Sequence, residues 1–386
     1  MAWAPLLQLS RMARLRSLSV GFLPDGAGLQ YLARSVDGLS GLQSLHISFD
    51  EPPTPDGAFL AGLSFIGRLV GLSCLKLCIV QTMAPPPWLS SLTALSSLQA
   101  NLRVRPSDIA TLAALPALRE LIDFACDAGG GGALPAACCP SVAVLQHCRI
   151  EHTGLAALAA AFPMLTTAGI RIFGGDDEEA PHPAAMPAAL APWRSLQTLQ
   201  IEGFELLDER HIRSAFNALL ALLRGASELT TLELTSVEMD EEFDDDDIYP
   251  RTGWRDADVA ALLAHAPATL ESLKLCPVAS LTDAAFAGCP PLPALKTLHL
   301  HWMAPLRLTP GGLLALGRAM PGLERLCLSA EPFAQGIGGD EQSMAWIAQL
   351  DALGGGAQPA EGSGNALLLA IRSALAREVA AGARLA

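Results

Sequence analysis

The sequence predicts an α/β solenoid curved into a horseshoe, with parallel strands on its concave face and helices on its convex face. Three observations support this prediction: a short apolar phrase recurs, its copies keep a regular spacing, and a helix-like stretch follows most copies. The clearest copy is LKTLHL at residues 295–300. Its second and third leucines are two residues apart, so they share one face of a short strand. One strand cannot bury these leucines alone, and stacked copies form a parallel sheet over a continuous apolar core.

The phrase is clean in some copies and degraded in others. Clean copies begin at residues 15, 42, 72, 196, 229, 270, 295 and 323, and degraded copies begin at residues 95, 118, 142 and 165. In two degraded copies, His147 and Ala168 stand where a larger apolar residue is expected. The starts at 270, 295 and 323 are 25 and 28 residues apart, within the range of roughly 20–29 that is typical of leucine-rich repeats. Over residues 11–330 the chain resembles leucine-rich-repeat proteins, and we count about twelve repeats.

Helix-like stretches complete the repeating unit. Apolar residues recur near the helical period in residues 28–36, 155–162, 258–265 and 313–320. The last of these stretches is followed by Pro321, a common helix stop. We therefore expect an N-terminal cap over residues 1–10, the solenoid over 11–330, and C-terminal capping helices over 331–386 with a Gly-rich linker at 354–364.

Some copies resemble a cysteine-containing subtype of the repeat, which occurs in F-box substrate receptors. Residues 139–155 are most similar to it, with Cys139 and Cys148, and residues 281–286 (LTDAAF) and 308–313 (LTPGGL) resemble its turn into the helix. No F-box is visible before residue 15. The resemblance implies an alternative role as the substrate-recognition subunit of a ubiquitin-ligase-like complex. The Ala- and Gly-rich style of the repeats is also similar to ciliary and cytoskeletal structural components.

Composition excludes some functions and favours a compartment. The net charge of −14 argues against a general nucleic-acid surface, and no apolar run approaches the roughly 20 residues of a membrane span. Nine scattered cysteines favour a reducing compartment, so we expect the cytoplasm, with the cytoskeleton or ciliary axoneme as an alternative. Arginines at 11, 14 and 16, with no acidic residue before Pro24, leave an organelle transit peptide open.

An acidic run interrupts the repeats at residues 240–247. It does not match a calcium-binding EF-hand loop, because the sixth and twelfth positions counted from Asp240 are Asp245 and Arg251 instead of glycine and glutamate. We expect a solvated surface loop, and binding of an ion or a basic partner remains the alternative.

One possible metal site lies on neighbouring strands. His299 and His301 are two residues apart on one face of their strand, and the repeat alignment places Cys276 and Cys327 beside them. Two histidines and two cysteines are a plausible zinc set, but flat neighbouring strands rarely supply the required geometry. We therefore expect no metal, and the alternative is a zinc site of these four residues.

Two common enzyme motifs are missing from the sequence. It contains no G-x-S-x-G nucleophile elbow and no phosphate-binding G-x-x-x-x-G-K-[ST] loop, and the glycine run at 129–132 is not followed by lysine. We expect a non-enzymatic protein without a cofactor.

The concave face is the remaining candidate site. Its small polar and scattered charged side chains suit a protein partner, while an array that only supports neighbours in an assembly is the alternative. We also expect Phe124 and Asn101 to point outward on this face. The predicted partner-binding residues are His46, Lys76, Gln99, Glu120, Arg171, Gln200, Glu202, Glu233, Lys274, His299, His301 and Arg325.

Overall fold

The structure is a computed structural model. It describes residues 12, 14–21, 26–49, 57–79, 82–126, 137–151, 155–173, 193–203, 209–235, 254–278, 281–302, 307–330, 370–371, 373–374 and 376. The expected cap at residues 1–10, the linker at 354–364 and the acidic run at 240–247 lie outside these residues. The chain divides into two compact units, residues 1–193 and residues 194–386.

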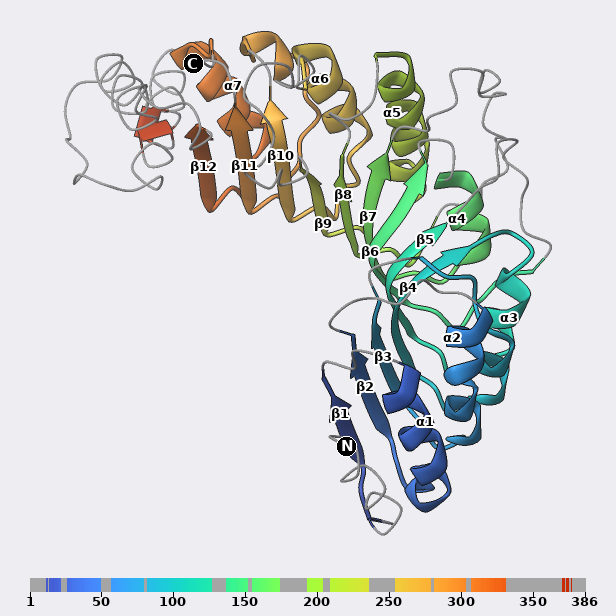
Figure 1. Cartoon of the computed structure of the whole chain (residues 1–386). Helices are drawn as coiled ribbons and strands as arrows, with labels where there is room; N and C mark the ends of the chain where they lie inside the picture. The colour runs from blue at the N-terminus through green and yellow to red at the C-terminus, as the bar shows by residue number, and fades with distance from the viewer. Residues whose placement is uncertain are drawn as a thin grey trace, which may run out of the picture. The chain divides into compact units, whose positions relative to one another are not determined.

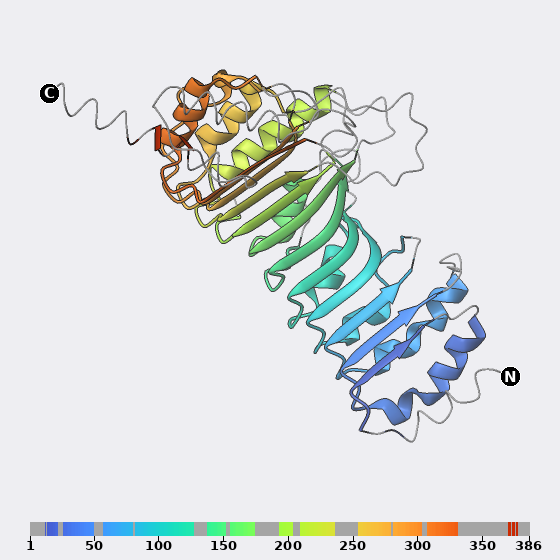
Figure 2. The same cartoon turned by 90° about the vertical axis from the view of Figure 1, so that its left-hand side faces the viewer.

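The first unit is a parallel sheet whose strands follow one another in sequence order (Figures 1 and 2). Its strands are β1 (Ser17–Val20), β2 (Ser44–Ser48), β3 (Cys74–Cys78), β4 (Ser97–Val104), β5 (Glu120–Cys126), β6 (Val144–Glu151) and β7 (Thr167–Phe173). Its helices are α1 (Gly26–Ser35), η2 (Val36–Leu39), α2 (Gly57–Gly62), η3 (Ser64–Arg68), η4 (Pro87–Ser91), α3 (Ile109–Ala113) and α4 (Leu155–Ala161). The helices cover one face of the sheet.

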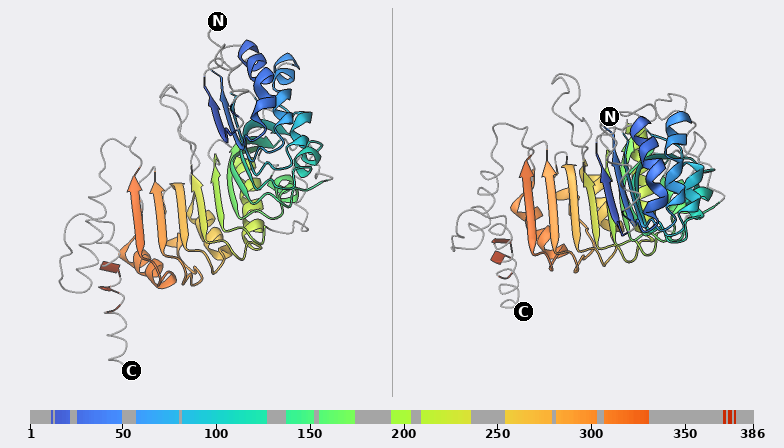
Figure 3. Two further views of the ribbon diagram at one scale, coloured as in Figure 1. Left: turned by 90° about the horizontal axis from the view of Figure 1, so that it is seen from below. Right: turned by 60° about the horizontal axis from the view of Figure 1, so that its bottom comes forward.

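The second unit repeats this arrangement of parallel strands with helices on one face, as the two views of Figure 3 show. Its strands are β8 (Thr198–Glu202), β9 (Thr231–Thr235), β10 (Ser272–Val278), β11 (Thr297–Trp302) and β12 (Arg325–Ala330). Its helices are α5 (Glu209–Leu223), α6 (Asp256–His265), η6 (Asp283–Ala285) and α7 (Pro310–Ala319). Near the C-terminus, Ala370, Ile371 and Ala374 are helical and buried.

Each of these strands begins two residues after the first apolar residue of a phrase, including the degraded copies. In β2 and β9 buried and half-buried residues alternate, as period-two reading of the phrase predicts. Leu298 and Leu300 of β11 are almost fully buried, and so is Leu295, which begins their phrase. The predicted α/β fold, the leucine-rich-repeat type of solenoid, is therefore confirmed.

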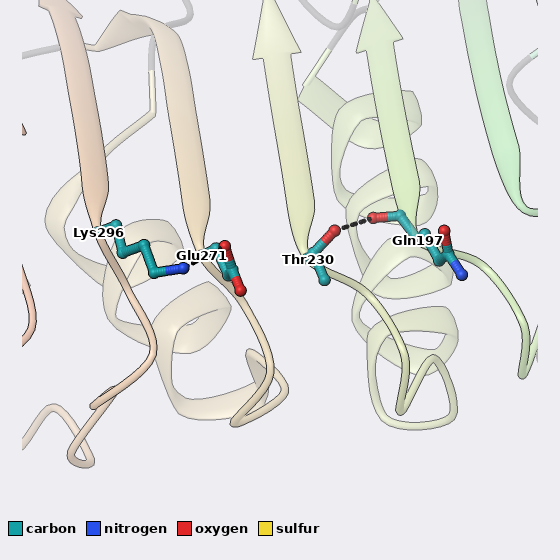
Figure 4. A network of polar contacts seen from close by, with 4 residues as sticks. All are labelled: Gln197, Thr230, Glu271 and Lys296. Atoms are coloured by element: carbon teal, nitrogen blue, oxygen red, sulfur yellow. Dashed lines mark hydrogen bonds and ion pairs between the residues drawn. The ribbon is translucent and has the colours of Figure 1, made fainter.

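A second regularity joins neighbouring repeats at the residue after the first leucine. There, Thr230 donates its hydroxyl to the carbonyl oxygen of Gln197, 3.0 Å away (Figure 4). Ser73, Ser96 and Thr166 make the same bond to the preceding phrase. Lys296 replaces it with an ion pair to Glu271 at 2.7 Å (Figure 4). That ion pair is largely exposed, so the backbone hydrogen bonds that run beside these side chains contribute more to the register.

Threonine and aspartate join the repeats again where the chain turns into the helices. The carboxylate of Asp256 accepts hydrogen bonds from the backbone N–H and the hydroxyl of Thr282, at 2.8 and 2.5 Å. Asp283 holds Thr309 in the same way, at 2.8 and 2.5 Å. A Cβ added at Gly312 would lie 2.0 Å from Oδ1 of Asp283, so this close approach requires glycine. We call each pair of hydrogen bonds from one threonine to one aspartate a clamp. The clamp at Thr309 fixes where α7 begins.

Candidate functional site

In each unit the sheet has an open face, which is the face opposite the helices (Figures 1 and 3). In the second unit, strand pairing aligns Gln200 with Glu233, Glu233 with Lys274, and Lys274 with His299. We call these four residues the central row. They are exposed or half-buried, and each lies between two buried residues of its strand. The positions expected from the phrase are therefore the positions that the structure brings together.

Two further predicted residues flank the central row. Glu202 ends β8 opposite Thr235 and is half-buried. Arg325 begins β12 opposite Thr297 and is exposed. Charge is thus present on both sides of the row.

Histidines of β11 give the second unit its other polar feature. Sγ of Cys276 lies 3.2 Å from Nδ1 of His301, and the rings of His299 and His301 are 6.1 Å apart. Partial burial, together with the neighbouring charges of Lys274 and His301, lowers the pKa of His299. His299 is therefore biased toward its neutral form, which can both donate and accept hydrogen bonds.

The considered zinc set does not assemble around one point. Cys327 aligns with His299 on the neighbouring strand, and Cys276 lies within hydrogen-bond distance of His301. In the parts of the chain that the structure describes, no group of three or more His, Cys, Asp or Glu side chains could hold a metal ion.

In the first unit, His46, Lys76 and Gln99 occupy one row on β2, β3 and β4. His46 lies between two partners: its Nδ1 is 3.2 Å from the Ser19 hydroxyl, and its Nε2 is 3.3 Å from Sγ of Cys78. These contacts hold the imidazole across three adjacent strands. His46 is thus held in place by its neighbours on β1 and β3.

Carboxylates of β5 receive hydrogen bonds from β4. The hydroxyl of Ser97 donates to Glu120 at 2.7 Å, and the amide of Gln99 donates to Asp123 at 2.6 Å. Gln99 and Glu120 were predicted on this face, whereas Asp123 was not. The two carboxylates give this part of the open face a local negative charge.

The expectation that Phe124 points outward is wrong. Its ring is fully buried and packs edge-on against Phe162, with ring centroids 6.0 Å apart. The preceding Asp123 adopts a positive φ of 59°, so the second inward residue of β5 comes three positions after Leu121 instead of two. Burying the Asp123 carboxylate would cost far more than this local turn of the backbone.

Strand β6 also keeps the polar residue at the third phrase position out of the core through a positive φ. His147 occupies the third phrase position, adopts a φ of 51° and stays exposed, while Cys148 is buried in its place. Burial, and secondarily the nearby Cys126, raises the pKa of the Cys148 thiol well above its usual value. Burial and the adjacent Cys138 raise the pKa of Cys139 to about 12. Both thiols are therefore protonated core side chains and not nucleophiles.

Sequence reasoning also missed two arginines. Arg171 was predicted and lies on the open face of β7, but the structure pairs it with Arg149 and places Arg103 in the same row. Period-two reading of β6 does not reveal Arg149, because the extra residue at His147 reverses the alternation. The available signal was chemical: aspartate and histidine tolerate positive φ better than most residues.

Comparison with known proteins gives structural likeness without sequence likeness. No protein-family model matches the chain, and no curated protein matches its sequence. Among solved structures, a chain of the yeast Rad7 and Elc1 complex is 14% identical, with a TM-score of 0.39, over 86% of this chain and 76% of its own. The leucine-rich-repeat protein LegL7 of Legionella pneumophila is 12% identical, with a TM-score of 0.33, over 89% and 99%. A leucine-rich-repeat protein of Leptospira interrogans is 12% identical, with a TM-score of 0.30, over 90% and 97%.

None of the helices that the structure describes is long and apolar enough to cross a bilayer.

Proposed function

We propose that the protein is a non-enzymatic interaction scaffold that binds a protein partner on the open face of its sheet. The observation that carries this proposal is the central row, Gln200, Glu233, Lys274 and His299, on four adjacent strands. Strands about 4.8 Å apart present these side chains as one continuous polar strip. The buried leucines behind them hold the strip rigid, which lowers the entropy cost of binding.

The chemistry of the row suits a protein surface. It contains an amide, a carboxylate, an ammonium group and an imidazole whose lowered pKa keeps it neutral. A mixture of hydrogen-bond donors and acceptors with charges of both signs is typical of the polar contacts across protein interfaces. A phosphate backbone, by contrast, needs a row of cations.

The test is a double variant that places charge and bulk at the centre of the row, Gln200→Arg with Glu233→Arg. Proteins captured by the tagged wild-type chain are identified, and the affinity of the purified partner for each variant is then measured. We expect the double variant to lose about tenfold or more in affinity, because binding energy concentrates in a central cluster. Its melting curve should stay close to that of the wild type, since both side chains lie outside the core.

A matched control carries the same change of charge away from this face. Asn217→Arg on α5 with Glu228→Arg in the following loop alters two exposed residues. This control should bind like the wild type. Loss of binding in the control but not in the row variant would contradict the proposed surface.

The second proposal is the more specific role in a ubiquitin-ligase-like complex, as a substrate-recognition subunit. Its support is that Cys139 and Cys148, which carry the resemblance to F-box receptors, are fully buried in the repeat core. The clamps at Thr282 and Thr309 add support at the turns into the helices. Ligase subunits among the captured proteins are expected under this role. Cytoskeletal or ciliary proteins would instead favour a structural component.

For localisation, we propose the cytoplasm, with the cytoskeleton, the cilium or an organelle as the alternatives. The scattered cysteines favour a reducing compartment. Imaging of chains tagged at the C-terminus, with and without residues 1–24, tests this. Relocation on removing the Arg-containing segment would favour the organelle.

A further inference from the structure

Three arginines share one row on the open face of the first unit. Arg103 aligns with Ala125, Ala125 with Arg149, and Arg149 with Arg171, on the adjacent strands β4 to β7. Each arginine lies between two buried residues of its strand, so all three side chains leave the sheet on the same side. Four strands span about 14 Å between the outer two arginines. We call these three residues the arginine row.

The neighbouring Asn101 orients Arg149 without cancelling its charge. Ala125 is small, so Arg149 can reach across β5, and its Nη2 donates to Oδ1 of Asn101 on β4. Asn101 is uncharged, so this hydrogen bond orients the guanidinium and leaves its positive charge in place. A guanidinium presents five N–H donors in a planar fork, which matches a carboxylate in two-bond geometry.

The arrangement concentrates positive charge in a chain whose net charge is −14. Like charges facing each other on adjacent strands repel, so Arg149 beside Arg171 destabilises the sheet unless an anion lies between them. We propose that the arginine row binds a short acidic segment of a partner protein, through its aspartate and glutamate carboxylates. This inference rests on the proposed function of the open face and names the chemistry of the partner there.

The surroundings favour a peptide over a nucleic acid. Asp123 lies two residues before Ala125, the residue of β5 that aligns with the arginines, and Glu120 lies earlier on the same strand, with both carboxylates on the same face. A nucleic-acid strand carries a negative charge at every nucleotide and would meet these carboxylates. An acidic peptide can place carboxylates over the arginines and neutral residues over Glu120 and Asp123. The length of the row also fits about four residues of extended peptide.

The test uses the whole chain and a fluorescent hexaglutamate peptide, with hexaglutamine as the uncharged counterpart and oligothymidine as the nucleic-acid counterpart. Affinities are measured by fluorescence anisotropy at low and high salt. We expect hexaglutamate to bind, hexaglutamine not to bind, and added salt to weaken the binding. Arg149→Gln with Arg171→Gln should lower the affinity for hexaglutamate by about tenfold or more.

Matched variants separate charge from folding. Arg34→Gln with Arg213→Gln removes two exposed arginines from helices α1 and α5, and should change the affinity by less than about twofold. Arg149→Lys with Arg171→Lys keeps the charge and should retain part of the binding, because only the two-bond geometry is lost. If the double glutamine variant melts early, Arg171→Gln alone provides the measurement.

Several outcomes would overturn the arginine row as an acidic-peptide site. They are equal binding of hexaglutamine, unchanged hexaglutamate binding in the double glutamine variant, or tighter binding of oligothymidine that depends on the same arginines. The central-row variant Gln200→Arg with Glu233→Arg keeps the two inferences apart. If the central-row variant abolishes partner binding while hexaglutamate binding does not depend on the arginines, only the acidic-peptide inference fails.

Discussion

Strands β8 and β9 carry clean copies of the phrase, whereas β5 and β6 carry degraded ones, and the difference shows how this fold treats a misplaced polar residue. In β8 and β9 the inward residues are two apart and the pairing is regular. In β5 and β6 the third phrase position holds Asp123 or His147, and the inward residues are three apart. The register between β5 and β6 stays matched, and the shifts fall at β4–β5 and β6–β7.

The comparison teaches that the core takes priority over the ideal strand. A left-handed residue costs roughly 1–2 kcal/mol, while burying an unpaired charge costs several times more. The chain therefore accepts positive φ at two residues and brings Phe124 and Cys148 inward. As a consequence the following outward positions change, and Arg149 comes to lie beside Arg171.

The largest expected effect tests the inward position of Phe124. Phe124→Ala should lower the free energy of unfolding by about 3–5 kcal/mol, because it removes a buried ring and its contact with Phe162. Ile122→Ala, at a half-buried position of the same strand, should cost much less. Denaturant unfolding measures both. Similar losses would mean that the alternation of β5 is not as described.

The regular strands supply the next test. Leu298→Ala should cost about 2–5 kcal/mol, because it leaves a cavity in the core of the second unit. His299→Ala, one residue later on the open face, should cost far less. Denaturant midpoints of the two variants give the ranking. The opposite ranking would mean that His299, and not Leu298, faces the core.

Backbone strain provides a smaller contrast. His147→Gly should be neutral or stabilise the protein by up to about 1 kcal/mol, because glycine adopts positive φ without a steric cost. His299→Gly, in a regular strand, should instead destabilise the protein by about 0.5–1 kcal/mol. Thermal and denaturant melts compare the two substitutions. A destabilising His147→Gly would mean that contacts of the side chain outweigh the strain.

The smallest expected effect concerns pH. Because the folded-state pKa of His299 lies below its ordinary value of 6.5, the unfolded chain takes up this proton first as the pH falls. This contribution should therefore lower stability as the pH drops through about 6.5, down to the folded-state pKa. His299→Gln should lose less stability than the wild type between about pH 7.5 and pH 5. Parallel pH dependences of the two proteins would contradict the lowered pKa.

The sequence by itself determined where the strands lie and which leucines form the core. The phrase combines a period of two with a regular spacing, and both are local properties of the chain. It also placed Gln200, Glu233, Lys274 and His299 on one face, because clean copies leave no choice of register. The helix starts near residues 155, 258 and 313 were predicted to within about three residues for the same reason.

Only the tertiary structure decided what the degraded copies do. Whether Asp123 turns inward or the backbone bends depends on the core space that Phe124 fills against Phe162, a residue of another repeat. The arginine row depends in turn on the backbone turns at Asp123 and His147 and on the pairing of strands β4 to β7. Burial and strand pairing are properties of the packed array, so no local pattern at Arg103, Arg149 or Arg171 could reveal that the three side chains lie together.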